Sequence, residues 1–303
     1  MKNSAVRQVI FPLLAALIWG TAFVAQSVAA AATPPMAFNA VRGVVAVVFL
    51  APMARVFDAV AASRGVPLEK TDRKKLLLGA LCCGAILAAA ANLQQAGMAS
   101  TSAGKAGFIT AFYVVLVPVF GVFLGKRSGG RLWFSVVLVA VGLYLLCIKA
   151  GEGFRVESGD VLVILCSVFF AFHVLCVDYW AQRVDGVKLS CAQFAVVAVV
   201  SAVLSLCFEA VDWTAMRQCV PQILYMGIMS SGFAYTLQIL AQKGSNPTIV
   251  SLLFSLESVF SVLAGAVLLG DKMTGREYLG CVLMFIAVIL AQIPLKKPEK
   301  RLQ

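Results

Sequence analysis

Long runs of apolar residues, separated by short polar connections, make up most of the chain. Each run approaches the length of about 20 residues, with a range of about 17–25, that an α-helix needs to cross the hydrocarbon core of a bilayer. The longest connection, Asp58–Lys75, is too short for a soluble domain. The pattern predicts ten transmembrane helices, at Val9–Ala31, Phe38–Phe57, Leu76–Ala96, Ala106–Gly125, Leu132–Ile148, Val161–Val177, Leu189–Phe208, Val220–Ala241, Thr248–Gly270 and Tyr278–Leu295.

Composition supports a membrane protein. Of the 303 residues, 61% are hydrophobic and 13% are charged, whereas a soluble protein has about 45–50% apolar and about 25% charged residues. These values exclude a disordered chain, a coiled coil, a collagen and an ordinary cytosolic enzyme. The net charge of +11 could indicate a nucleic-acid partner. Basic loops of a membrane protein explain it better, so we expect a lipid bilayer and no nucleic acid as a partner.

The distribution of Lys and Arg predicts the orientation of the chain. If the N-terminus is cytoplasmic, eighteen of the 25 basic residues lie on the cytoplasmic side, and Arg42 lies within a predicted helix. The six on the other side are Lys105, Lys149, Arg155, Arg217, Lys272 and Arg276. Because cytoplasmic loops carry the excess of Lys and Arg, we expect a multi-pass protein of a bacterial-type cytoplasmic (plasma) membrane with both termini cytoplasmic.

The nine cysteines give no sign of a metal site or a disulfide framework. Most lie inside apolar runs, and the chain has neither paired CxxC units nor a Cys/His cluster. We therefore expect no metal and no cofactor. Gly121 and Gly125 form a GxxxG unit, a spacing that lets membrane helices approach closely. We predict that this unit packs within one chain, while a homodimer stays open as an alternative to a monomer.

An internal repeat divides the chain. A shift of 145 residues places Leu124-Gly125 on Leu269-Gly270 and Gly130-Arg131 on Gly275-Arg276. Nearer the start, a shift of 151 places Trp19 on Phe170. Two repeats of five helices, residues 1–150 and 151–303, would be inverted because five is odd. Inverted repeats are typical of secondary transporters, whose binding site lies near the membrane midplane between the repeats.

Several segments resemble the EamA-type permeases of the drug/metabolite transporter superfamily. The run from Leu13 to Phe23 is similar to the opening pattern of that family, and Phe38-Asn39-Ala40-Val41-Arg42 resembles its second helix. Ser255–Phe260 followed by Leu268–Lys272 resembles its ninth helix. Ser258 stands where the family pattern has Pro, and Asp271 where it has Glu. These two departures concern the expected kinking of this helix and leave the resemblance to the family intact. The resemblance implies two five-helix repeats and transport of small metabolites, often amino acids.

Glu257 lies about ten residues from either end of its predicted helix. A charge at that depth costs about 2.5–3.5 kcal/mol on insertion scales, so Glu257 needs an explanation. It is either a site for proton coupling or a substrate amine, or a structural carboxylate paired within the bundle.

Other polar and aromatic residues inside the predicted helices complete the candidate site. Arg42 can snorkel to the outer interface, pair with Glu257 or bind a substrate carboxylate. His173, the one histidine of the chain, is a proton relay or a hydrogen-bonded core residue. The amide and tyrosine side chains act as contacts between helices or line a central cavity. The candidates for substrate binding or coupling are Trp19, Asn39, Arg42, Asn92, Gln95, Tyr113, His173, Gln193, Tyr235, Gln238 and Glu257.

The sequence therefore predicts an all-α polytopic membrane protein with ten transmembrane helices as two inverted five-helix repeats. We expect a secondary transporter that moves small organic metabolites, amino acids or related compounds, by alternating access, with export favoured. The sequence names neither the substrate nor the coupling ion. The alternatives are a membrane-embedded enzyme and a channel-type subunit. We expect no enzyme, because Met229–Gly232 and Leu268–Asp271 each lack a glycine of the intramembrane protease motifs.

Overall fold

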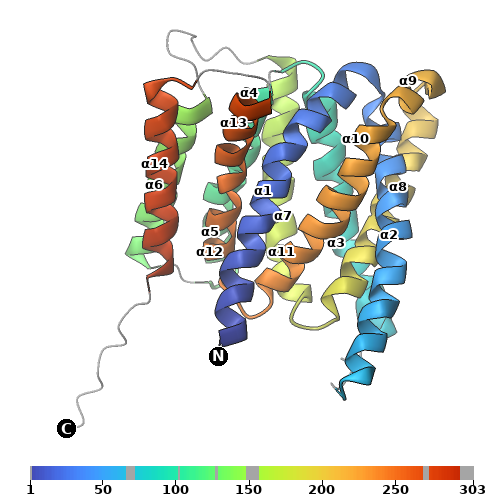
Figure 1. Ribbon diagram of the computed structural model, residues 1–303, viewed down its shortest axis with the longest axis horizontal. Coiled ribbons are helices and arrows are strands. Elements are labelled where there is room, and N and C mark those ends of the chain that lie inside the picture. Colours follow the sequence, from blue (N-terminus) through green and yellow to red (C-terminus); the bar gives the residue numbers. More distant parts are fainter. Residues whose placement is uncertain are drawn as a thin grey trace.

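A computed structural model describes residues 2–65, 72–101, 103–126, 129–147, 157–268 and 273–293. In these residues the chain forms a bundle of long, roughly parallel helices (Figure 1). The helices are α1 (Lys2–Ala32), α2 (Pro35–Ser63), α3 (Arg73–Gly97), α4 (Ala103–Ala111), α5 (Tyr113–Phe123), α6 (Gly130–Cys147), α7 (Ser158–Trp180), α8 (Gly186–Phe208), α9 (Trp213–Gln218), α10 (Val220–Tyr225), the π-helix η1 (Met226–Ala234), α11 (Tyr235–Gln242), α12 (Pro247–Phe254), α13 (Leu256–Leu268) and α14 (Gly275–Gln292).

All ten predicted crossings are present. Among the described residues, nine helical runs are long and apolar enough to cross a membrane, and Gly130–Leu146 is a shorter apolar helix. The runs α4–α5, α10–η1–α11 and α12–α13 each form one crossing. This confirms the predicted all-α membrane fold. The predicted ends at Ile148, Gly270 and Leu295, and the residue Asp271, lie outside the described residues.

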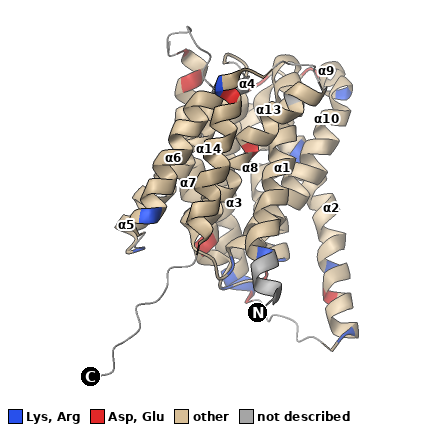
Figure 2. Ribbon diagram, turned by 60° about the vertical axis from the view of Figure 1, so that its left-hand side comes forward, with Lys and Arg blue, Asp and Glu red and all other residues tan. Residues whose placement is uncertain are grey.

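Polar residues define where several helices begin. Helices in a bilayer satisfy their backbone hydrogen bonds internally, but the first N–H groups need other acceptors. Side chains just ahead of five helices accept hydrogen bonds from the first turn: Asp72, Asp185, Asp212, Asn246 and Thr274. Most charged residues lie toward the two ends of the bundle, and few lie in the band between them (Figure 2). This band is the part that suits the hydrocarbon core.

The packing of the helices follows the inverted repeat. The second helices of the two halves, α2 and α8, pack together, as do the fifth helices, α6 and α14. The contact of α3 with α7 has its counterpart in the contact of α1 with η1 and α11. The contact of α1 with α13 is likewise matched by that of α7 with α4 and α5. The start of α1 and the end of α14 lie at the same end of the bundle (Figure 1).

Close helix crossings occur at glycines other than the predicted ones. A Cβ atom on Gly280 would lie 2.7 Å from the carbonyl oxygen of Gly142, and one on Gly142 would lie 2.9 Å from that of Gly280. These two residues let α6 and α14 approach. Gly125 instead has a φ of +75° and ends α5 in a turn. The predicted packing of the Gly121/Gly125 unit within the chain is therefore wrong, because a helix boundary falls between the pair.

Candidate functional site

A cavity of about 50 Å³ lies between the two halves of the bundle. This volume has room for a few water molecules and is far below the range of about 300–1,000 Å³ for small-molecule sites. A larger solute therefore requires movement of the surrounding helices. Seven predicted candidates line the cavity: Trp19, Arg42, Tyr113, His173, Tyr235, Gln238 and Glu257.

The lining obeys the internal repeat. α1 and α7, the first helices of the two halves, place four and three residues in the cavity wall, and three of the four on α1 correspond to the three on α7 at the predicted shift of 151. The pairs are Trp19 with Phe170, Ala22 with His173, and Phe23 with Val174. The cavity therefore lies on the pseudo-two-fold axis. Its chemistry is nevertheless asymmetric, since a histidine in one half corresponds to an alanine in the other.

The fourth helix of each half changes its regular hydrogen bonding at a single residue beside the cavity, while the backbone there keeps right-handed helical dihedral angles. α4 gives way to α5 at Phe112, and α12 gives way to α13 at Ser255. Tyr113 directly follows the first of these positions, Glu257 lies two residues after the second, and both line the cavity. Discontinuous helices form the binding sites of many transporters. The irregularity at Ser255 occurs although Ser258 replaces the proline expected in this helix.

Arg42 is buried, with 3% of its surface exposed. Its Nε donates a hydrogen bond to the Ser231 hydroxyl on η1, at 3.2 Å. The predicted snorkelling to the membrane surface is wrong, because the tight packing of α2 against η1 directs the side chain inward. No ion pair joins Arg42 to Glu257 in the described part of the chain. Of the three roles weighed for Arg42, ligand binding is the one left open.

Glu257 is 5% exposed and belongs to the first turn of α13. Among the described residues no cationic side chain forms an ion pair with it. The hypothesis of a paired structural carboxylate therefore finds no basic partner in this structure. Because a buried carboxylate without a cationic partner is costly away from water, Glu257 is a candidate to bind a cationic ligand group or a proton.

Aromatic side chains form one wall of the cavity. The Trp19 ring packs edge-on against Tyr235, with centroids 4.9 Å apart, and against Phe254 at 5.1 Å. Within the described residues Trp19 Nε1 and Gln238 Oε1 have no hydrogen-bond partner. One is a donor and the other an acceptor. The cavity therefore offers a ligand both an apolar surface and unpaired polar atoms.

Four predicted candidates lie outside the cavity lining and connect helices. Asn39 on α2 donates to Asn92 Oδ1 on α3 at 2.9 Å, and Asn92 donates to Ser201 on α8 at 2.9 Å. Gln95 donates to the carbonyl of Gln26 at 3.3 Å. Gln193 Oε1 lies 3.2 Å from His173 Nε2. These amides form buried contacts between helices. Gln193 reaches the cavity only indirectly, through its contact with His173 in the cavity wall.

Comparison with known proteins identifies the family. The sequence profile of the EamA-like transporter family matches residues 7–148 and 157–292. The chain belongs to this family. An uncharacterized transporter of Archaeoglobus fulgidus is 27% identical over 92% of this chain and 84% of its own length. The uncharacterized transporter YwfM of Bacillus subtilis is 24% identical over 96% and 95% of the two chains. A solved crystal structure shares the fold, with a TM-score of 0.74 over 94% of this chain and 96% of its own at 19% identity.

In this EamA-like transporter a chain of three further polar side chains also lines the cavity. Gln26 donates to Gln94 Oε1 at 2.9 Å, and Gln94 donates to the Thr110 hydroxyl at 3.2 Å. All three residues line the cavity. Their depth within apolar segments marks them in the sequence as helix contacts or cavity residues. The sequence does not say which of the two roles they have, since their approach depends on the packing of α3 and α4 around α1.

The π-helix η1 is a feature of this EamA-like transporter that sequence patterns did not predict. It replaces nine residues of the eighth crossing, and Ser230 within it lines the cavity. Longer π-helical stretches are rare, and π-bulges are frequent at functional sites. A Cβ atom on Gly227 would lie 2.5 Å from Val45 on α2. The missing side chain lets η1 and α2 approach, and this approach brings Ser231 to Arg42.

Proposed function

We propose that this chain is a secondary transporter of small organic metabolites, amino acids or related compounds, and that it exports them by alternating access. The observation that carries the proposal is the cavity on the pseudo-two-fold axis, which contains buried Arg42 and Glu257. A guanidinium and a carboxylate in one cavity complement the carboxylate and the ammonium of an amino acid. The aromatic wall around Trp19 suits an apolar side chain.

Two features of the fold support alternating access. The halves surround the cavity with equivalent helices in opposite orientation, so exchanging their conformations exposes the cavity to the other side. The one-residue irregularities at Phe112 and Ser255 are points at which the fourth helices can bend during this exchange. The cavity of about 50 Å³ then corresponds to a state between the two open ones.

The experiment that tests this function uses the purified chain in liposomes. Vesicles are loaded with a labelled amino acid or a related metabolite, and efflux is measured with and without a pH gradient. We expect saturable flux of at least one such solute, and dependence on the gradient would identify protons as the coupling ion. Absence of flux across the whole set, or flux that never saturates, would contradict the proposal and favour an enzyme or a channel.

We also propose the orientation, with both ends of the described chain facing the cytoplasm. Exposed basic residues gather at the end of the bundle where α1 begins, for example Arg73, Lys74 and Lys75 at the start of α3. The opposite end carries Glu157, Glu209 and Asp212. This asymmetry agrees with the positive-inside rule.

A further inference from the structure

An apolar groove faces outward between α3, α5 and α7, away from the central cavity. Its volume is about 620 Å³, and it is lined by residues such as Ile86 on α3, Phe120 on α5, Leu124 just after α5, and Phe172 and Tyr179 on α7. The rings of Phe120 and Phe172 stack with centroids 4.7 Å apart and an interplanar angle of 7°. These stacked rings form a firm wall of the groove. In a membrane this surface contacts acyl chains.

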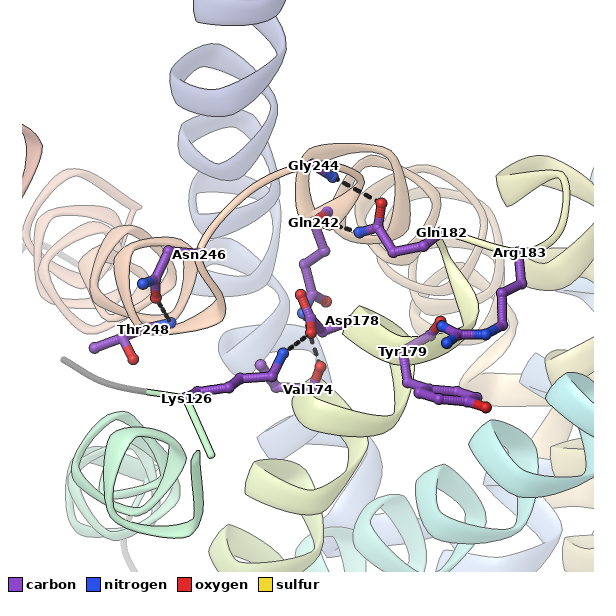
Figure 3. Close-up of polar contacts among 10 residues, drawn as sticks. All are labelled: Lys126, Val174, Asp178, Tyr179, Gln182, Arg183, Gln242, Gly244, Asn246 and Thr248. Carbon is purple, nitrogen blue, oxygen red and sulfur yellow. Dashed lines mark hydrogen bonds and ion pairs between the residues drawn. The ribbon is translucent and has the colours of Figure 1, made fainter. Parts of the chain in front are cut away.

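The groove ends at basic residues on the side where α1 begins. α5 leads within three residues to Lys126, and α7 leads within three residues to Arg183. The Arg183 guanidinium lies over the Tyr179 ring, with its carbon 3.5 Å from the ring centroid, and Arg183 Nη1 donates to the Tyr179 carbonyl at 2.5 Å (Figure 3). Because Tyr179 lines the groove, this stacking holds an exposed positive charge at its mouth.

Neighbouring charges make this mouth positive. Lys126 forms an ion pair with Asp178, which neutralises one charge (Figure 3). α3 begins nearby, since a Cβ atom on Gly79 would lie 3.0 Å from the Trp180 ring. Its first residues, Arg73, Lys74 and Lys75, are exposed. Basic pockets between membrane helices on the cytoplasmic side bind the head groups of anionic lipids.

We propose that this groove binds an anionic phospholipid, with one acyl chain along α5 and α7 and the phosphate at Arg183. The apolar wall alone would accept a second copy of this chain or an apolar solute. The positive mouth of the groove lies at the level of the lipid head groups and complements the charge of a phosphate. It therefore favours an anionic lipid over a second copy of the chain or an apolar solute. The site is separate from the central cavity, so the proposal does not depend on which solute the chain carries.

Native mass spectrometry of the full-length chain in detergent tests the charge part of this inference. The chain is titrated with phosphatidylglycerol and, in parallel, with phosphatidylcholine of the same acyl chains. We expect the first lipid bound to be phosphatidylglycerol, and we expect Arg183→Gln to weaken its binding about fivefold, the effect of one basic residue near an anionic head group. Arg217→Gln, which removes an exposed charge at the opposite end, is the matched control and should leave binding unchanged.

A second variant tests the groove itself. Ile86→Trp places a large ring in the groove and should reduce phosphatidylglycerol binding, whereas Ile164→Phe, on an exposed part of α7 outside the groove lining, should not. Inorganic phosphate alone should fail to compete, because it lacks the acyl chain. Equal binding of the two lipids, equal effects of Arg183→Gln and Arg217→Gln, or a groove occupied by a second copy of the chain without lipid would each overturn the proposal.

Discussion

At the scale of single residues, the chain keeps two buried ionisable groups in its middle without pairing them with each other. Arg42 donates to the neutral hydroxyl of Ser231, and no ion pair reaches Glu257 within the described residues. Buried charges are normally paired because an uncompensated one is costly. The same absence of pairing leaves both groups available to a ligand. Neutral neighbours such as Trp19 and Gln238 add polar atoms that have no hydrogen-bond partner within the described residues.

Glu257 provides the sharpest prediction at this scale. Glu257→Gln keeps the size of the side chain and removes its negative charge. If the carboxylate binds a substrate amine or a proton, solute flux in liposomes should fall about tenfold or more, since a hydrogen bond to a charged group contributes about 1.5–3 kcal/mol. The matched control is Glu277→Gln, a carboxylate that caps α14 outside the cavity. Normal flux with an unchanged pH dependence in Glu257→Gln would assign Glu257 a structural role.

At the scale of elements, the irregular helices of the bundle all lie beside the cavity, together with the continuous helices α1 and α7. The crossings α4–α5, α12–α13 and α10–η1–α11 change their geometry near residues of the cavity wall, whereas α6 and α14 run without a break. Such irregularities are points at which a helix can bend. Continuous helices packed through Gly142 and Gly280 form a firm support. The fifth helices, α6 and α14, contribute no residue to the cavity wall and pack against each other.

Gly280 tests the supporting role of α6 and α14. Gly280→Ala would place a Cβ atom 2.7 Å from the Gly142 carbonyl oxygen and 2.9 Å from the Leu146 nitrogen, both of them backbone atoms. We expect destabilisation of about 1–3 kcal/mol, the usual cost of overpacking, seen as a lower thermal unfolding midpoint in detergent. Gly107→Ala is the control, because nothing lies within 4 Å of its Cβ position. Equal midpoints for the two variants would contradict a close crossing.

At the scale of the whole molecule, contacts between the halves hold both ends of the bundle. At the end where α1 begins, Lys126 pairs with Asp178, and Lys188 pairs with Asp58 at 2.8 Å. At the other end, the Glu209 carboxylate accepts hydrogen bonds from the first N–H groups of α2, at 2.8 and 2.9 Å. Each contact joins one half to the other. An opening at either end must therefore break interactions between the halves.

The Lys126–Asp178 pair tests this description of the first end. Lys126→Asp alone places two carboxylates together and should favour an opening at that end, whereas the exchange Lys126→Asp with Asp178→Lys restores an attractive pair. Accessibility of Tyr235→Cys to a water-soluble thiol reagent from that side measures the opening, in a chain whose native cysteines are replaced. We expect faster labelling in the single variant and a return toward the original rate in the exchange variant. Equal rates in all three proteins would show that this pair does not hold the end closed.

The orientation of the whole molecule gives a prediction of its own. A cysteine introduced for Arg217, on the end that carries Glu209 and Asp212, should react with a membrane-impermeant reagent added to intact cells. One introduced for Lys74, at the other end, should react only after the cells are opened. Both positions are exposed, so a difference reports the side of the membrane. The reverse pattern would refute the proposed cytoplasmic termini.

The sequence by itself determined the ten crossings, the inverted repeat and seven residues of the cavity wall. Apolar length fixes which segments enter a bilayer, and a polar residue deep in such a segment is costly enough to stand out, as Glu257 and His173 do. The tertiary structure decided which polar residues share the cavity. Asn39 and Asn92 pair with each other while Gln26 and Gln94 face the cavity, because the rotation and crossing of packed helices set these contacts. The irregularities at Phe112 and Ser255, η1 and the inward direction of Arg42 depend on the same packing, which no local pattern encodes.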